Sequence, residues 1–243
     1  MIYNEEEGII PVIESIHTCA LPPGYERRIV AINDGSTDES QQMLERAART
    51  YSVHTIQYKT RRGMPESFRG VFQYLAKVVQ DDDIVFTLEA DGTNDIACIP
   101  GFVEEIKKGA DVVIASRYVP GAASIGLPKH RLLMSALINM FLRRILLRIP
   151  NVRDYTVLYR AYRGSVLRKY ASDNIPFAAR KSFAVIPEIL GCVSHYTNKF
   201  AEVPLRYDYG LKKGPSKMKI FQTLSEYIRI TPAMFILSLS RKK

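Results

Sequence analysis

Two acidic clusters in the first half of the chain contain the residue types best suited to chemistry. Residues 33–38 read Asn-Asp-Gly-Ser-Thr-Asp, and residues 89–95 read Glu-Ala-Asp-Gly-Thr-Asn-Asp. Clustered carboxylates repel one another, so they usually hold a cation or a hydrogen-bonding ligand. Aspartate and glycine also build ordinary turns and helix caps, and this alternative stays open for either cluster alone. Two such clusters together favour a binding site.

The surrounding elements are predicted to bring these clusters to one place. Short β-rich runs alternate with helical patterns: strands are expected at Arg28–Ile32, Val53–Tyr58, Asp83–Leu88 and Asp111–Ala115, and helices at Asp38–Thr50, Pro65–Gln80 and Ile96–Lys108. This alternation predicts an α/β fold with a mostly parallel central sheet flanked by helices on both faces. Ligands of such sheets bind beyond the carboxyl ends of the strands, where both clusters and Arg117 would converge.

A long apolar helix is predicted at Pro128–Ile149, and it carries one polar stripe. Arg131, Ser135, Asn139 and Arg143 recur at every fourth position and therefore stack on one face. A stripe of this kind is usually a solvated face. Ser135 and Asn139 on so apolar a helix nevertheless favour a groove for a polar ligand, with the apolar flanks facing core or lipid.

The charge balance predicts an anionic partner. The 243 residues include 34 Lys+Arg against 25 Asp+Glu, a net charge of +9 that suits nucleic acid, an acidic membrane surface or a phosphorylated substrate, although plain solubility also explains it. The three cysteines form no CxxC pair, which disfavours a disulfide framework and a structural zinc site. The chain has neither a GxxxxGK[ST] nor a GxGxxG motif, which disfavours Walker nucleotidases and Rossmann dehydrogenases.

No segment is predicted to cross a membrane. The longest apolar, uncharged stretches, Leu132–Leu142 and Ile230–Ser240, have 11 residues each. A bilayer-spanning helix needs about 20. No charged region precedes an apolar one at the start, so no signal peptide is expected. These features predict a cytoplasmic protein.

Eight short motifs follow one another along nearly the whole chain. They are Tyr3-Asn4-Glu5-Glu6, Asn33–Asp38, Glu89-Ala90-Asp91, Ser116-Arg117-Tyr118, the helix residues Arg131, Ser135 and Asn139, the set Asp154, Thr156 and Arg160, Glu202-Val203-Pro204, and Gly214-Pro215-Ser216-Lys217. In this order they resemble the GT-A glycosyltransferases of family 2, most closely the dolichol- and polyprenol-phosphate mannosyltransferases. Four positions depart from the family pattern: Asn33 and Glu89 replace aspartates, Thr93 replaces a glutamine, and Leu211 stands where an arginine is usual.

The resemblance implies a GT-A nucleotide-sugar-binding fold with a C-terminal acceptor-binding segment. It implies a single glycosyltransferase domain over residues 1–243, with a nucleotide-sugar-binding half at 1–118 and an acceptor-binding, membrane-facing half at 119–243. The implied reaction is inverting transfer of a hexose, mannose or glucose, from a GDP- or UDP-hexose to a polyprenyl or dolichyl phosphate.

The resemblance also implies roles for individual residues. Asp91, Arg117 and Arg131 would be catalytic, and Glu89 and Asp91 would bind Mg²⁺ or Mn²⁺ on the diphosphate. The residues expected to bind substrate are Tyr3, Asn4, Glu5, Asn33, Asp34, Ser135, Asn139, Arg160 and Lys217.

Acid–base chemistry favours a phosphate acceptor. A phosphate monoester has a second pKa of about 6, so its oxygen is already anionic at neutral pH and needs no general base. Inverting members of the family that attack with a hydroxyl often carry a Glu-Asp base motif, and processive synthases carry a motif ending in Arg-Trp. This chain has no Glu-Asp dipeptide and no tryptophan.

Two other functions remain open at this point. One is a family 2 transferase that acts on a saccharide or protein hydroxyl, and the other is a non-enzymatic basic module that binds membrane or nucleic acid. Arg143, Arg144 and Arg148 are interleaved with Leu and Ile rather than with aromatic residues, which suits lipid better than nucleic acid. The sequence therefore predicts a peripheral protein on the cytoplasmic face of a membrane, with no nucleic-acid partner. A membrane-protein partner is left open.

The start of the chain departs from the family in one further respect. The family's first β-strand lies just ahead of its Tyr-Asn-Glu motif, whereas only Met1 and Ile2 precede Tyr3 here. The sequence therefore predicts that one central strand is missing, as in a chain truncated at its start.

Overall fold

Three sheets form the β-structure of the computed structural model, which describes residues 1–180, 182–212 and 220–240. β1 (Ile29–Asp34) pairs in parallel with β2 (Val53–Tyr58). A four-stranded sheet has the order β3 (Ile84–Thr87), β6 (Arg160–Arg163), β4 (Val112–Ser116) and β7 (Phe200–Pro204). β5 (Ala123–Ile125) pairs in parallel with β8 (Arg206–Asp208).

The direction of β6 differs from the simple parallel arrangement expected from the first half of the chain. β4 and β7 are parallel, but β6 runs antiparallel to both β3 and β4, between which it lies. The sequence analysis predicted no strand here, because the segment Arg160-Ala-Tyr-Arg163 shows neither an apolar run nor a clear alternation. The four strands predicted in the first half lie within two residues of the observed ones.

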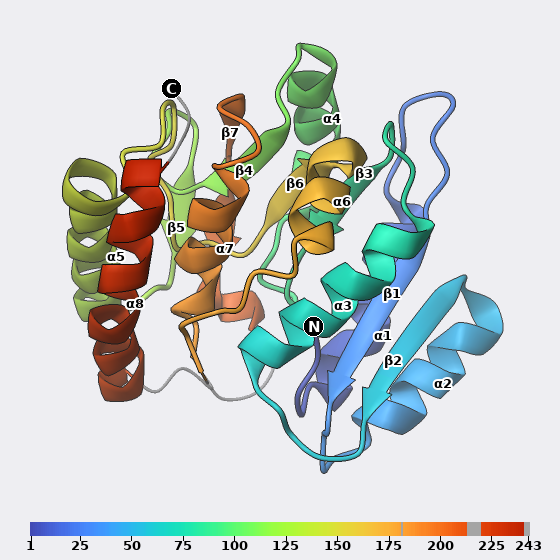
Figure 1. Ribbon diagram of the computed structural model, residues 1–243. Helices are drawn as coiled ribbons and strands as arrows, with labels where there is room; N and C mark the ends of the chain where they lie inside the picture. Colours follow the sequence, from blue (N-terminus) through green and yellow to red (C-terminus); the bar gives the residue numbers. More distant parts are fainter. Residues whose placement is uncertain (181, 213–219, 241–243) are drawn as a thin grey trace.

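Helices cover both faces of the four-stranded sheet (Figure 1). α3 (Met64–Val78), α6 (Gly164–Ser172) and α7 (Val185–Val193) lie in front of it in this view, and α4 (Ile99–Lys107), which follows the short helix η1 (Ile96–Cys98), lies behind it. α1 (Glu6–Thr18) and α2 (Ser40–Thr50) pack beside β1 and β2. The remaining elements are α5 (Lys129–Phe141), η2 (Leu142–Leu146), η3 (Tyr209–Leu211) and α8 (Ile220–Ser240).

β4 shows how the sheet is held between these helices. All five of its residues are buried. Val112 and Ile114 face the large core formed with α3, α6 and α7, whereas Val113 and Ala115 face the core formed with Phe102 of α4. A strand buried on both faces is apolar throughout, and this explains why it was recognisable from sequence.

Ile2 takes the position beside β1 where the sequence analysis expected a strand to be missing. Its N–H donates to the carbonyl of Ile32 at 2.8 Å, and its carbonyl accepts from the N–H of Asp34 at 2.9 Å. This is an isolated parallel bridge opposite Asn33. Within the described residues no strand joins β1 to β3.

The long helix predicted at Pro128–Ile149 is shorter than expected. The regular helix α5 ends at Phe141, and residues Leu142–Leu146 form a π-helical turn. A π turn holds more residues than an α turn, so the side chains after it point in a different direction around the helix axis. Leu142 and Leu146 are thereby buried in the core while Arg143 is exposed, so the predicted polar stripe ends at Asn139.

None of the described helices is long and apolar enough to cross a membrane. α8 is the longest of them, with 21 residues, and it packs against α7 and η2.

Candidate active site

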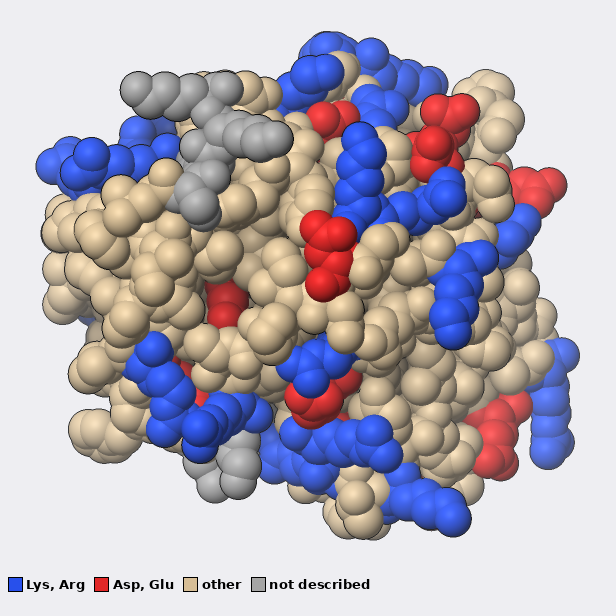
Figure 2. All heavy atoms as spheres, viewed as in Figure 1, with Lys and Arg blue, Asp and Glu red and all other residues tan. Residues whose placement is uncertain are grey.

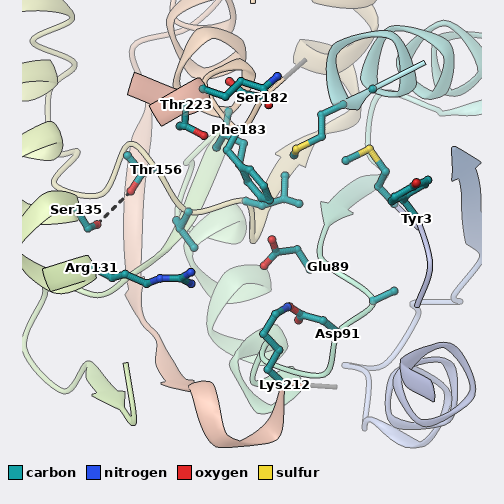
Figure 3. Close-up of a pocket in the computed structure, with 18 of the residues that line it drawn as sticks. Tyr3, Glu89, Asp91, Arg131, Ser135, Thr156, Ser182, Phe183, Lys212 and Thr223 are labelled. Carbon is teal, nitrogen blue, oxygen red and sulfur yellow. Dashed lines mark hydrogen bonds and ion pairs between the residues drawn. The ribbon is translucent and has the colours of Figure 1, made fainter. Parts of the chain in front are cut away.

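A cavity of about 810 Å³ opens at the carboxyl ends of β1, β3 and β4. It is lined by both halves of the chain, and Figure 3 shows Arg131 and Glu89 pointing into it from opposite sides. The predicted site residues that line it are Tyr3, Glu5, Asp34, Glu89, Asp91, Arg117, Arg131 and Ser135. This is the place where ligands of α/β sheets are expected.

One end of the cavity is built around Asp34. This buried carboxylate accepts hydrogen bonds from the backbone N–H groups of Arg62 at 2.8 Å and Gly63 at 2.9 Å. Gly63 has a φ of +90°, a conformation that glycine adopts without strain. The guanidinium of Arg61 lies over the ring of Tyr3 at 3.9 Å. This end of the cavity thus presents an arginine stacked on an aromatic ring, with the Asp34 carboxylate held in place nearby.

Asn4 and Asn33 shape the loop at residues 33–38 and do not line the cavity. The Asn4 amide oxygen accepts from the N–H of Thr37 at 2.8 Å, and its backbone N–H donates to Ser36 Oγ at 3.0 Å. Asn33 accepts from the N–H of Ser36 at 3.1 Å and donates to Gln41 at 2.9 Å. Their side chains are therefore committed to the loop, whereas neighbouring Tyr3, Glu5 and Asp34 reach the cavity.

Glu89 and Asp91 lie in the loop after β3, where the sequence analysis expected metal ligands. Asp91 is buried, and its Oδ1 accepts from the N–H of Thr93 at 3.1 Å and from the Thr93 hydroxyl at 2.6 Å. Its Oδ2 forms an ion pair with Lys212. The pKa of Glu89 is raised to about 7, first by burial and second by the charge of Asp91, while Lys212 opposes the shift.

This pair of carboxylates suits a divalent cation that arrives with its own oxygen ligands. Among the residues that the structure describes, no group of three or more His, Cys, Asp or Glu side chains is placed to hold a metal. Mg²⁺ is commonly held by one or two carboxylates together with substrate phosphates. Glu89 and Asp91 therefore fit a metal carried by a diphosphate. The Thr93 hydroxyl would orient Asp91, since it is already bonded to it.

Arg117, at the end of β4, is clamped by a buried carboxylate. Its Nε and Nη2 donate to the two oxygens of Asp154 at 2.7 and 2.9 Å, and Nη2 also donates to Thr156 at 2.7 Å. Burial alone would lower the pKa of Arg117 and raise that of Asp154, but their mutual attraction outweighs it and shifts both pKa values the other way. The pair is a fixed ion pair, and the guanidinium borders the cavity.

Arg131 and Ser135 reach the cavity from α5. Arg131 Nη1 donates to the hydroxyl of Tyr209 at 3.2 Å, and its guanidinium lies 5.6 Å from the centre of that ring. The hydroxyl of Ser135 lies 2.9 Å from that of Tyr118 and 3.5 Å from that of Thr156. Two positions one turn apart on α5 thus present a guanidinium and a hydroxyl to the same space.

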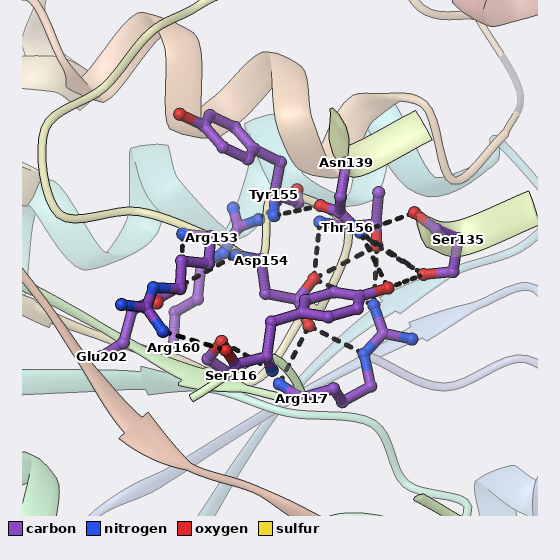
Figure 4. Close-up of polar contacts among 11 residues, drawn as sticks. Ser116, Arg117, Ser135, Asn139, Arg153, Asp154, Tyr155, Thr156, Arg160 and Glu202 are labelled. Carbon is purple, nitrogen blue, oxygen red and sulfur yellow. Dashed lines mark hydrogen bonds and ion pairs between the residues drawn. The ribbon is translucent and has the colours of Figure 1, made fainter. Parts of the chain in front are cut away.

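Asn139 and Arg160 are buried and are not among the residues that line the cavity. Figure 4 shows both beside the turn at residues 154–156. Asn139 accepts from the N–H of Tyr155 at 2.6 Å and donates to Thr156 at 3.1 Å. Arg160 is 1% exposed and donates to the carbonyls of Tyr155 at 2.7 Å and Ile186 at 2.8 Å. Both residues fix the turn at residues 154–156. Lys217 lies outside the described residues.

Several lining or supporting residues had no role in the sequence analysis. Asp154 and Thr156 stood in a motif without an assigned function, and their spacing of two was the available signal. Tyr209 gave no signal. Lys212 stands next to Leu211, where the family usually has an arginine, and this was its signal, although its contact with Asp91 across 121 positions was not predictable. Such a contact depends on how the chain folds back.

The family model described as "Glycosyl transferase family 2" matches residues 1–171. The dolichol-phosphate mannosyltransferase of Pyrococcus furiosus is 28% identical over 228 residues, which cover 93% of this chain and 60% of that protein. The undecaprenyl-phosphate mannosyltransferase of Micrococcus luteus is 28% identical over 217 residues, 86% of each chain. An undecaprenyl-phosphate 4-deoxy-4-formamido-L-arabinose transferase of Pectobacterium carotovorum is 32% identical over 168 residues, 68% of this chain and 48% of that protein.

Solved structures with the same architecture are more distant in sequence. The glucosyl-3-phosphoglycerate synthase of Mycobacterium tuberculosis in complex with uridine diphosphate is similar with a TM-score of 0.63 and 18% identity, over 100% of this chain and 79% of that one. S. aureus TarS 1-349 in complex with UDP-GlcNAc is similar with a TM-score of 0.66 and 15% identity, over 99% of this chain and 65% of that one. At these identities the likeness concerns the fold alone.

Proposed function

The chain belongs to glycosyl transferase family 2, and we propose that it transfers a hexose from a nucleotide-sugar donor to the phosphate of a polyprenyl phosphate. It is a glycosyltransferase with the GT-A α/β fold that its sequence predicts. The P. furiosus and M. luteus relatives, a dolichol-phosphate and an undecaprenyl-phosphate mannosyltransferase, support the polyprenyl-phosphate acceptor. The chain spans 60% of the length of the P. furiosus relative, so we propose its donor and its acceptor rather than assign them from that relative.

One observation carries the proposal. A single cavity has two acidic side chains at one wall and a guanidinium at the opposite wall, with Glu89 facing Arg131 across the space (Figure 3). An acidic wall suits a metal-bound diphosphate, and an arginine with a neighbouring hydroxyl suits a second phosphate group. Such a cavity fits a reaction that joins two phosphate-bearing substrates.

The donor end of the cavity suits a nucleoside diphosphate sugar. Asp34, with Arg61 stacked on Tyr3 nearby, would hold the nucleoside of a GDP- or UDP-hexose. Glu89 and Asp91 would hold Mg²⁺ or Mn²⁺, which neutralises the charge that grows on the departing diphosphate. The M. tuberculosis synthase, a relative in fold, was solved with Mn²⁺ and UDP-glucose.

The acceptor end supplies donors for a phosphate monoester. Arg131 and Ser135 would bind its oxygens, and Arg117, fixed by Asp154, would add charge at the same edge. Held there, an anionic phosphate oxygen attacks the anomeric carbon opposite the leaving diphosphate, which inverts that carbon. No protein base is required, because the phosphate oxygen is anionic above about pH 6. We propose mannose or glucose as the hexose.

An apolar side of the molecule suits attachment to a lipid surface. On α5, Leu133 and Leu137 are 62% and 51% exposed, and on α8, Phe221 and Ile228 are 88% and 76% exposed. Figure 2 shows this side, at the left, as largely uncharged, with basic side chains above and below it. Apolar surface flanked by positive charge suits the interface of an anionic membrane. We propose peripheral association, on the cytoplasmic face.

A second candidate is transfer to a hydroxyl acceptor. Glu89 favours it, because a carboxyl with a pKa raised to about 7 can act as a general base at neutral pH. In that case Glu89 would take the proton of the attacking hydroxyl and would not be a metal ligand.

The deciding experiment compares polyprenyl phosphate with the free polyprenol at equal concentration. The protein is incubated with Mg²⁺ and radiolabelled GDP-mannose or UDP-glucose, and lipid product is extracted with organic solvent. We expect label on the phosphate alone, with a rate that falls below about pH 6 as the acceptor gains its second proton. Equal labelling of the free alcohol would favour the hydroxyl acceptor instead.

A further inference from the structure

A lysine occupies part of the space next to the acidic pair. The ammonium of Lys212 forms an ion pair with Asp91 Oδ2, and the two side chains are only 14% and 6% exposed. Lys212 follows η3 and lines the cavity, and Figure 3 shows it beside Asp91, below Glu89 in this view. This contact therefore involves the carboxylate that would bind the metal.

The charges around this point explain why a cation lies there. Glu5, Glu89 and Asp91 all line the cavity, and at least two of these carboxylates are within electrostatic reach of one another. Buried carboxylates without a counter-ion are strongly unfavourable. In the donor-free protein Lys212 supplies a positive charge to Asp91, and its flexible four-carbon side chain can leave without movement of the backbone.

We propose that Lys212 is an internal counter-cation that competes with the divalent metal for Asp91. Asp91 Oδ1 already accepts two hydrogen bonds from Thr93, so Lys212 and the metal would compete for Oδ2, and the free protein would bind metal weakly. Additional ligands from the donor diphosphate would favour the metal over the lysine, and metal binding would then depend on donor binding. This inference rests on the proposed function, since it takes the metal to be part of the donor complex.

The test measures Mn²⁺ binding to the full chain without any nucleotide, by titration calorimetry and by the electron paramagnetic resonance signal of free Mn²⁺. The variants are Lys212→Met and Lys212→Gln, with Lys169→Met as a matched control, because Lys169 is an exposed lysine on α6. Removing the competitor should tighten Mn²⁺ binding about tenfold, a usual size for coupling between two ligands. The control should bind as the unmodified chain does.

Two further readouts tie the gain to Asp91 and to a folded protein. Adding Asp91→Asn to Lys212→Met should abolish the gain. Mn²⁺ should also raise the melting temperature of Lys212→Met more than that of the unmodified chain, because tighter binding to the native state stabilises it more. In the chain without substitutions, labelled by ¹³C-methylation of its lysines, Mg²⁺ should shift the Lys212 methyl resonance and leave that of Lys169 in place.

The outcomes separate this inference from the proposed function. If neither Lys212 variant binds Mn²⁺ more tightly and Mg²⁺ leaves the Lys212 resonance unmoved, the competition is wrong. If in addition Mn²⁺ binds in the presence of GDP or UDP, the proposed metal-bound donor stands. If Mn²⁺ binds to no variant with or without either nucleotide, both the competition and the metal in the proposed function are wrong.

Discussion

Glu89 and Asp91 are two residues apart, yet the structure gives their carboxylates different surroundings. Asp91 is held on both oxygens, by the N–H and hydroxyl of Thr93 on one and by the ammonium of Lys212 on the other. Glu89 faces the cavity with a pKa raised to about 7, chiefly by burial. One carboxylate is thus fixed by its partners, whereas the pKa of the other lies near neutral pH.

The raised pKa of Glu89 predicts how stability depends on pH. The folded protein holds the Glu89 proton more tightly than the unfolded chain does, whose ordinary value is 4.5. The resulting stability is fully present below about pH 4.5 and is lost as the pH rises through about 7. Glu89→Gln mimics the neutral form, so with a chelator present the variant should melt at least about 2 °C above the unmodified chain at pH 8.

Thermal melts of both proteins from pH 5 to pH 8 check this. The difference between them should grow with pH, and Glu66→Gln, an exposed carboxylate in a surface ion pair, should show no such growth. Parallel melting curves for Glu89→Gln and the unmodified chain would contradict the raised pKa.

At the scale of elements, the turn at residues 154–156 fixes the end of the cavity that we propose binds the acceptor. Glu202 of β7 accepts from the N–H groups of Arg153 and Asp154 at 2.7 and 2.8 Å, and Asn139 of α5 accepts from the next residue of the turn. Through Asp154, the same turn fixes Arg117 (Figure 4). β7 and α5 thus hold the turn whose Asp154 fixes the Arg117 guanidinium.

α5 contributes the other guanidinium, and Arg131 tests the acceptor role. If Arg131 grips the acceptor phosphate, Arg131→Ala should lower kcat/KM for polyprenyl phosphate about tenfold to a hundredfold, since a hydrogen bond to a charged group contributes about 1.5–3 kcal/mol. Arg131→Lys should recover only part of this, because a point charge cannot pair two oxygens as the planar fork does.

Initial rates with each substrate varied in turn give the measurement. The donor KM should change little, because Asp34 and the acidic pair lie at the other end of the cavity. Arg49→Ala, an exposed arginine on α2, serves as the control. A rise in the donor KM with an unchanged acceptor KM would indicate that Arg131 binds the donor and not the acceptor.

For the molecule as a whole, the proposed membrane-facing surface depends on α5, η2 and α8 together rather than on any one of them. α5 and α8 lie on one side of the molecule, away from α1 and α2 (Figure 1), and all three elements carry exposed apolar residues. On η2, Ile145 is 59% exposed and lies beside Arg143 and Arg144. In the proposed function, an acceptor lipid would reach the cavity from the membrane that this side of the protein contacts.

This arrangement predicts salt-sensitive binding to anionic liposomes. Each basic residue near an anionic leaflet contributes about 1 kcal/mol, so replacing Arg143, Arg144 and Arg148 by Glu should weaken sedimentation with the liposomes strongly at low salt. A matched control replaces three exposed arginines beside the opposite end of the molecule, Arg28, Arg46 and Arg49, by Glu. Equal loss in the two triple variants would point to net charge alone, and no binding at low salt would remove the membrane from the proposal.

Local sequence patterns were enough to predict the elements of the first half and the edge of the sheet at which the site lies. β1 to β4 are recognisable because each is a short run rich in aliphatic, β-branched or aromatic residues, a pattern that neighbouring residues alone create. Asp34, Glu89, Asp91 and Arg117 follow these strands, and a parallel sheet brings such positions to one edge. The division into halves at 118 and 119, and the role of each site residue, stay predictions.

Which side chains face the cavity depends on tertiary packing and could not be predicted from the sequence. Asn139 and Arg160 belong to the same motifs as Ser135 and Thr156, yet they are buried and do not line the cavity, because the 154–156 turn needs their hydrogen bonds. The π turn after α5 likewise depends on burying Leu142 and Leu146 rather than on any local signal. The contact of Lys212 with Asp91 joins positions 121 apart, and no periodicity or spacing encodes it. Local sequence patterns therefore predict the strands and helices, whereas the side-chain contacts in the site depend on the packing of distant segments.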